Sequence, residues 1–143
     1  MPLDQLRAVD EAPYSAAIAA GVKLVMVSWA TYPALDPRLP AGLSFAVIHG
    51  ELRGRLHFHG VTITDGLGAG ALARFGGFSQ RGVLAADAGA DLLLCSVTNP
   101  NDNSPANGIA ALEGLAAALR DHKLSRTDAQ QAARRVIALR STP

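Results

Sequence analysis

Three short apolar runs along the chain predict buried strands. They cover Val22–Ser28, Gly60–Thr64 and Asp91–Val97. A glycine precedes or opens each run, and the first two runs are rich in β-branched residues. Short apolar runs with such flanks are typical of fully buried strands. We therefore expect three buried parallel strands that are apolar on both faces; the helices of this chain can cover only one face well, so we expect self-association, pairing with a missing half, or terminal helices that rearrange over the other face.

Helical periodicity separates these runs. It predicts helices over 44–56, 70–75, 79–88, 108–122 and 125–140. Leu112, Leu115 and Leu119 share one face of the fourth helix, and we expect Ser125 to cap the last helix, with Val136 and Ile137 facing inward. The strand starts are roughly 30–38 residues apart, the size of a strand–helix unit. The pattern predicts one α/β domain over 1–143: about three parallel βα units with C-terminal helices.

The composition excludes several classes of protein. Thirteen Lys and Arg against twelve Asp and Glu leave a net charge of +1, without a basic stripe, so we expect no nucleic-acid partner. The most apolar stretch, Ala85–Val97, contains two aspartates and is shorter than the ~20 residues of a membrane span. The acidic N-terminal residues lack an apolar signal core, so we expect a cytoplasmic location for this chain, although a longer parent could be exported. A complete (β/α)8 barrel needs about 200 residues or more, which exceeds the 143 present.

Asp65 is the first candidate for chemistry, because it directly follows the second apolar run. Active groups of parallel α/β folds lie at the carboxyl ends of the strands. A carboxylate held there can act as a nucleophile or a base. It can equally begin a turn or cap the next helix, since Asp-Gly is a common turn pair. The residues alone leave these alternatives open.

Two polar stretches follow the other runs. Trp29, Tyr32 and Asp36 share the loop after the first run, where aromatic rings beside polar groups suit a sugar, or else simply cover the end of the sheet. The stretch Asn99–Asn107 could contact a substrate or form a solvated loop.

The histidines and the cysteine give weaker signals. His57 and His59 precede the second run, at the amino end where structural residues are expected, and no third ligand accompanies them, so we expect no metal. Cys95, the only cysteine, lies within an apolar run and is expected to be a core residue. Gly66, Gly68 and Gly70 lack the GxGxxG spacing of a dinucleotide loop, so we expect no cofactor.

Three segments together resemble a known family. They are Val25–Pro37 (VMVSWATYPALDP), Leu39–Ser44 (LPAGLS) and Leu52–Asp65 (LRGRLHFHGVTITD). In this order they are similar to the family 3 glycoside hydrolases, most of all to the bacterial β-N-acetylhexosaminidases. Ala88–Leu94 and Arg134–Arg140 extend the resemblance over nearly the whole chain.

The resemblance implies a partial TIM-type barrel, the C-terminal part of the family's catalytic domain. It implies that Asp65 is the nucleophile of a retaining mechanism and that the substrate is a β-linked N-acetylhexosamine. We place Trp29, Tyr32 and Met26 as substrate-contacting residues. The His–Asp acid/base loop of this branch has no counterpart in the sequence, and Gly66 and Gly68 stand where the family has a second acid and a serine.

We therefore expect a glycoside hydrolase as part of a larger barrel, with little activity from the chain alone. One alternative is a non-catalytic binding or assembly module derived from that fold, in which the half-barrel pairs with itself or with a missing half. Another is an unrelated small α/β protein in which Asp65 is only a turn residue.

Overall fold

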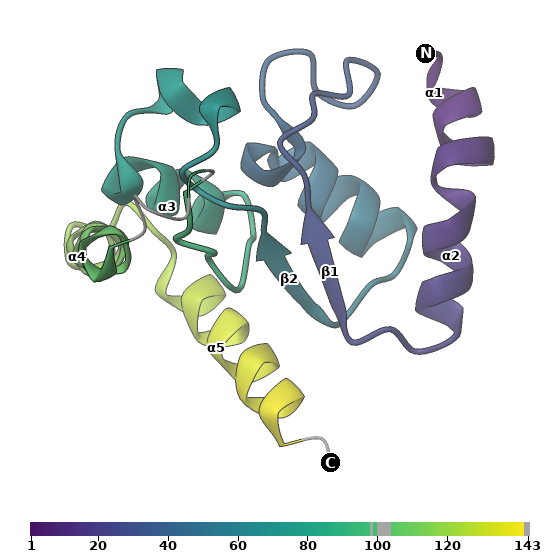
Figure 1. Ribbon diagram of the computed structural model, residues 1–143. Coiled ribbons are helices and arrows are strands. Elements are labelled where there is room, and N and C mark those ends of the chain that lie inside the picture. The colour runs from purple at the N-terminus through teal and green to yellow at the C-terminus, as the bar shows by residue number, and fades with distance from the viewer. Residues whose placement is uncertain (98, 100–103, 142–143) are drawn as a thin grey trace.

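The computed structural model describes residues 1–97, 99 and 104–141. A helical column opens the chain: α1 (Leu3–Gln5), the π-helical η1 (Leu6–Asp10) and α2 (Ala12–Ala19). Figure 1 shows it in purple beside the strands. The column ends where Gly21 adopts a φ of 85° and its N–H donates to the carbonyl of Ile18. A left-handed glycine at this point lets the chain reverse into the first strand.

Two parallel strands form the sheet. β1 (Leu24–Val27) pairs with β2 (Val61–Thr64), with Leu24 opposite Val61. The expected third strand is wrong as a full strand, because within the described residues it reaches the sheet through a single bridge, Ile63 to Leu92. The reason is that β2 ends at Thr64: the N–H of Leu94 donates to the Thr64 hydroxyl at 3.0 Å instead of a strand carbonyl. The segment still runs parallel beside β2.

The helix η3 (Ala46–Arg55) covers one face of the sheet and corresponds to the helix predicted over 44–56. Figure 1 shows it behind β1. A cluster of buried side chains fills the space between them: Val27, Ile48, Leu52, Phe58 and Ala88. His57 follows η3 with a φ of 55°, and the N–H of Phe58 then donates to the carbonyl of Leu52. This reversal directs the chain back into β2.

A second core lies at the other end of the strands, beneath the 3-10 helices η2 (Ala41–Leu43) and η4 (Gly70–Phe75) and the helix α3 (Phe78–Asp87). Its buried members are Trp29, Leu43, Leu67, Leu72, Ala85 and Ala90. The predicted helices 70–75 and 79–88 are thus confirmed, to within one residue at their ends. This core supports the loops at the carboxyl ends of the strands.

The helix α4 (Pro105–Arg120) packs on α3 through small residues, not through the predicted leucine face. A Cβ on Gly82 would lie 3.4 Å from Cβ of Ala111, and one on Gly114 would lie 2.4 Å from the hydroxyl of Ser79. The helix backbones approach so closely that Leu112 is left outside, with 66% of its surface exposed. Leu115 and Leu119 are partly buried, so the three leucines of this face are not buried together.

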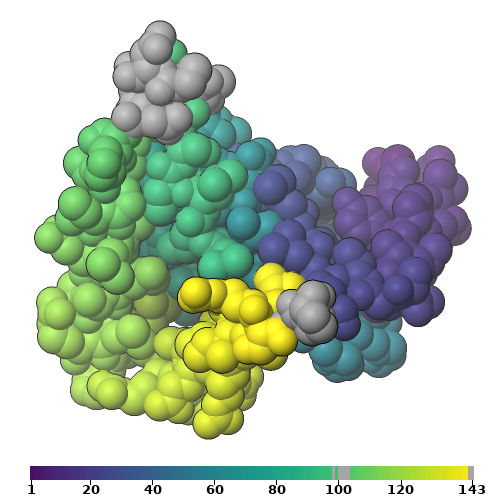
Figure 2. Space-filling view, turned by 60° about the horizontal axis from the view of Figure 1, so that its bottom comes forward, coloured from purple at the N-terminus to yellow at the C-terminus, as the bar shows by residue number. Residues whose placement is uncertain are grey.

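The helix α5 (Arg126–Arg140) closes the amino-end side of the strands. It begins as predicted, because the Ser125 hydroxyl accepts the N–H of Asp128 at 3.2 Å. Its predicted inner face is wrong at Ile137, which is 63% exposed. Arg135 points inward instead, toward the start of the third run. In Figure 2, where this side of the molecule comes forward, α5 lies across it in yellow.

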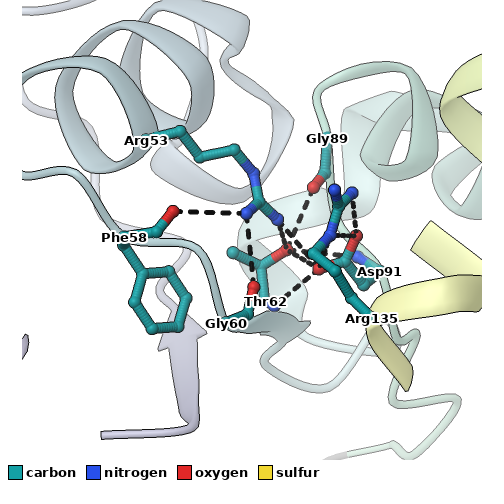
Figure 3. Close-up of polar contacts among 7 residues, drawn as sticks. All are labelled: Arg53, Phe58, Gly60, Thr62, Gly89, Asp91 and Arg135. Carbon is teal, nitrogen blue, oxygen red and sulfur yellow. Dashed lines mark hydrogen bonds and ion pairs between the residues drawn. The ribbon is translucent and has the colours of Figure 1, made fainter. Parts of the chain in front are cut away.

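A buried ionic network explains that orientation (Figure 3). Asp91 has a fully buried side chain and lies 2.8 Å from Nη2 of Arg53 on η3 and 2.7 Å from Nη2 of Arg135 on α5. It also accepts the backbone N–H of Thr62 in β2 at 2.9 Å. Arg53 donates further to the carbonyl of Gly60 at 3.2 Å. One carboxylate thus joins two helices to the base of the sheet.

One apolar strip on the strands stays open. Leu24, Met26 and Leu94 are 36%, 51% and 37% exposed. In a closed barrel, the opposite strands cover such a face. Among the described residues, no helix is both long and apolar enough to cross a membrane.

Candidate active site

Asp65 lies at the carboxyl end of β2, where the sequence places it. Its N–H donates to the carbonyl of Val27 at 3.2 Å, which carries the pairing of the two strands one residue past β2. The side chain is exposed, and its Oδ1 accepts the N–H of Gly66 at 2.6 Å. The carboxylate is therefore open to solvent on a backbone fixed by the sheet.

The loop Asp65–Gly68 is held against the third run. The N–H of Leu67 donates to the carbonyl of Leu94 at 2.8 Å, and the N–H of Gly68 donates to that of Ser96 at 2.8 Å. A Cβ on Gly66 would come within 2.8 Å of the Ser96 hydroxyl, and one on Gly68 within 2.5 Å of Val97. Glycine at both positions permits this close approach.

Two side chains reach the loop from other elements. The indole Nε1–H of Trp29 donates to the carbonyl of Gly66 at 2.9 Å. Arg81, on α3, donates from Nη1 to the carbonyl of Leu67 at 2.7 Å. Trp29 is 9% exposed and belongs to the core beneath the loop. Trp29 thus contacts the backbone next to Asp65, at Gly66, while its ring lies in the core. Contact between Trp29 and a substrate stays a prediction.

Tyr32 and Met26 lie together elsewhere. Both line a groove between β1 and the N-terminal column, with Leu6 and Tyr14 on its opposite wall. The residues lining this groove, all within the described part of the chain, do not include Asp65. A substrate role for Tyr32 and Met26 stays a prediction.

Asp36, the acid of the loop after β1, serves that loop. Its Oδ1 accepts the N–H groups of Arg38 and Leu39 at 2.9 and 3.1 Å, and its Oδ2 accepts the Ser44 hydroxyl at 2.7 Å. The bond from the Arg38 N–H, followed by that from Ser44, holds the pKa of Asp36 below its ordinary value. Asp36 is thus a poor proton donor at neutral pH, and it braces the loop that carries Trp29 and Tyr32.

The remaining candidates lie away from Asp65 or serve the core. Burial raises the pKa of the Cys95 thiol, which packs against the core as predicted. His57 and His59 are exposed at the amino ends of the strands. Of the polar stretch 99–107, positions 100–103 lie outside the described residues, and α4 already begins at Pro105.

The structure shows two charged residues that the sequence pattern did not reveal: Arg81 beside the candidate site and Asp91 at the base of the sheet. Arg81 was read only as part of a helix, because a guanidinium on an amphipathic helix looks like solvated surface. Its partner is 14 residues away, so no spacing rule links the two. For Asp91 a signal existed, since a carboxylate inside an apolar run needs a partner if it is buried.

An exposed carboxylate on a rigid strand end suits nucleophilic attack on a substrate carbon. Asp36, the acid of the neighbouring loop, is engaged by Arg38, Leu39 and Ser44 and is a poor proton donor. A nucleophilic role for Asp65 stays a prediction.

Known proteins resemble the chain over most of its length. The chain is 48% identical over 141 residues to an uncharacterized secreted glycosyl hydrolase of Arthroderma benhamiae, covering 99% of this chain and 38% of that protein. It is 44% identical over 92 residues to a beta-hexosaminidase of Stenotrophomonas maltophilia, covering 64% of this chain and 27% of that protein. The chain thus spans well under half the length of these curated relatives.

Solved structures agree with the sequence relatives. A glycoside hydrolase family 3 beta-N-acetylglucosaminidase from Paenibacillus sp. superimposes with a TM-score of 0.89 at 37% identity, over 97% of this chain and 26% of that one. A beta-N-acetylhexosaminidase from Beutenbergia cavernae gives 0.77 at 32% identity, over 90% and 36% of the two chains. The small parallel sheet and its helices are accordingly part of a TIM-type barrel. The description of the glycosyl hydrolase family 3 N terminal domain matches residues 1–139, so the chain belongs to glycosyl hydrolase family 3.

Proposed function

We propose that this chain supplies the nucleophile of a retaining glycoside hydrolase that acts on β-linked N-acetylhexosamines. The observation that carries the proposal is the position of Asp65, exposed at the carboxyl end of β2 on a loop fixed by its neighbours. Relatives named beta-hexosaminidase and beta-N-acetylglucosaminidase favour this substrate class.

In the proposed step, a carboxylate oxygen of Asp65 bonds to the anomeric carbon as the bond from that carbon to the leaving oxygen breaks. The leaving oxygen takes a proton from a general acid that lies outside this chain. Water later releases the sugar from Asp65, which completes retention of configuration.

The isolated chain should hydrolyse aryl β-N-acetylglucosaminides negligibly. General acid catalysis typically contributes about 10²–10⁴-fold, and the His–Asp acid/base loop of this family branch has no counterpart in the sequence. The measurement is release of the chromogenic phenol over hours at micromolar protein. Robust turnover that disappears in Asp65→Ala would contradict this expectation and reveal an acid within the chain.

A chimera tests the role of Asp65 directly. The chain replaces the corresponding segment of the Paenibacillus enzyme, to which it is 37% identical. A 5-fluoro aryl β-N-acetylglucosaminide, whose fluorine slows release of the bound sugar, should label the peptide that contains Asp65, as read by mass spectrometry. Asp65→Ala should abolish labelling and turnover. Asp87→Ala, at an exposed position of α3, is the matched control and should retain both.

Labelling of a different peptide, or full turnover by Asp65→Ala in the chimera, would overturn the proposal. Such a result would favour the reading in which Asp65 only begins a turn.

A further inference from the structure

We propose that Trp29 and Arg81 are positioning residues that clamp the backbone beside Asp65, an inference that rests on the proposed nucleophilic role of Asp65. Each donates to one of two consecutive carbonyls directly after the nucleophile. Trp29 donates to Gly66 at 2.9 Å and Arg81 donates to Leu67 at 2.7 Å.

Each clamped peptide group is held at both of its polar atoms. In the peptide between Gly66 and Leu67, Trp29 binds the carbonyl, and the N–H binds the carbonyl of Leu94. In the next peptide, Arg81 binds the carbonyl of Leu67, and the N–H binds the carbonyl of Ser96. Neither peptide plane can therefore turn without losing a hydrogen bond at a buried site.

On the other side of Asp65, its own N–H is tied to Val27 at 3.2 Å. The backbone is thus fixed before and after the nucleophile. The remaining peptide, between Asp65 and Gly66, gives its N–H to the carboxylate itself at 2.6 Å. The clamps consequently determine where that N–H and the carboxylate lie.

The Trp29 donor cannot turn away. Its ring is 9% exposed, and Gly42 lies so close that a Cβ there would meet a ring carbon at 2.4 Å. A buried indole N–H needs a partner, and Gly66 supplies it. The single tryptophan of the chain thus serves as a rigid donor whose direction is set by packing.

Arg81 differs in that its donor is charged. A charged donor makes a stronger hydrogen bond to a carbonyl than a neutral donor does. The accepting residue, Leu67, is fully buried, so water does not replace the guanidinium if it is removed. The Nε of Arg81 is itself buried and has no hydrogen-bond partner among the described residues. Arg81 therefore acts on the loop Asp65–Gly68 through its hydrogen bond to the carbonyl of Leu67.

Loss of either clamp should slow glycosylation of Asp65 more than it weakens substrate binding, because a small displacement of a reacting group can cost up to about 10²-fold in rate. In the chimera, Trp29→Phe keeps the aromatic ring and removes the N–H, and Arg81→Met keeps the length and removes the donor. We expect kcat to fall roughly 10- to 100-fold with KM within about a factor of two. Arg81→Lys should recover part of kcat.

Arg74→Met is the matched control. Arg74 also donates to a backbone carbonyl, that of Arg38 at 2.8 Å, but on the exposed surface. It should leave kcat and KM unchanged.

The chain itself offers a second readout. With one tryptophan, its indole N–H gives a single resonance, which should be protected from hydrogen exchange in the parent chain. In Arg81→Met, the amides of Leu67 and Gly68 should exchange faster while the amides of α5 keep their protection. Loss of protection throughout the chain would show that Arg81→Met unfolds it. In that case the Arg81 contact is tested with Arg81→Lys, and the Trp29 contact is tested with Trp29→Phe.

Unchanged kcat in both variants would overturn the clamp. A rise in KM alone for Trp29→Phe would also overturn it, in favour of direct substrate contact. If Asp65→Ala itself stays active in the chimera, the proposed function fails instead, so the two failures are distinguishable.

Discussion

At the scale of single residues, Asp91 is the buried carboxylate that neutralises two guanidinium groups. Its side chain is fully buried, and both guanidiniums that approach it are mostly buried, with exposures of 13% for Arg53 and 25% for Arg135. Burial lowers the pKa of Arg53, and the charge of Asp91 opposes that effect. Removal of the carboxylate charge would leave two cations facing each other in a poorly solvated space.

Asp91→Asn should therefore lower the free energy of unfolding by about 3–5 kcal/mol, the usual cost of breaking a buried ion pair from one side. Denaturant unfolding followed by circular dichroism measures it. Asp121→Asn removes the exposed partner of Lys123, 3.7 Å away, and should change stability by less than about 1 kcal/mol. Equal effects of the two substitutions would refute this assignment of the network.

At the scale of elements, His49 on η3 lies at the base of the fold, against Phe45 and Gly89. The ring stacks on Phe45 with centroids 4.2 Å apart. It also lies against Gly89, where a Cβ would meet its Nε2 at 2.4 Å. Burial is the main cause that lowers the pKa of His49 from its ordinary 6.5; Arg53 and Arg135 act in the same direction, and Asp91 and Asp128 oppose them.

This pKa shift predicts an acid-sensitive stability. Because the folded pKa lies below the unfolded 6.5, the unfolded chain binds a proton first as the pH falls through that value. The free energy of unfolding should consequently decrease below pH 6.5 by at most about 1.4 kcal/mol per pH unit from this group. Urea titrations at several pH values between neutrality and about 5 measure the slope, over a range where exposed carboxylates stay mostly ionised.

His49→Gln should remove this part of the slope, whereas His122→Gln, at an exposed turn after α4, should retain it. An unchanged slope in His49→Gln would show that another group carries the dependence.

The elements also show how far the sequence alone could go. Local signals succeeded: Ser125 begins α5, and a carboxylate directly after an apolar run lies at the carboxyl end of β2. The predicted inward face of α5 was wrong at Ile137. Periodicity also did not show that α4 packs through glycine and alanine and leaves Leu112 exposed. Periodicity reports which residues are apolar, but not how closely two helices pack.

The site shows the same division. The location of Asp65 follows from strand order, which a sequence pattern conveys. The clamps by Trp29 and Arg81 join residues 37 and 14 positions away from their partners. The Asp91–Arg135 pair spans 44 positions. Such pairings depend on how the strand ends are brought together in three dimensions, so no local pattern encodes them.

At the scale of the whole molecule, the open strip on the strands is the main unsatisfied feature. Leu24 and Met26 lie on β1, and Leu94 lies on the third run, beyond β2; all three are substantially exposed. Contiguous exposed apolar surface commonly marks an interaction site or an aggregation liability. This exposed surface is the observation that favours association of the chain with a second copy or with the missing part of the barrel.

We predict that the chain associates through this strip at micromolar concentration, as measured by light scattering. The double variant Leu24→Thr, Met26→Gln should weaken association at least about tenfold, because a fully buried large apolar side chain contributes about 1.5–3 kcal/mol. The control Ile109→Gln, Leu112→Gln removes exposed apolar groups from α4 instead and should leave association intact. A parent chain that stays monomeric with the strip open would contradict the prediction.

The dependence of Asp91 on Arg135 has a consequence for synthesis on the ribosome. The two residues are 44 positions apart, so at about 5–20 residues per second Arg135 is added roughly 2–9 s after Asp91. Throughout that interval the nascent chain holds a carboxylate destined for burial with only Arg53 to neutralise it. The base of the sheet therefore cannot reach its final form until α5 has been synthesised and has docked against Asp91.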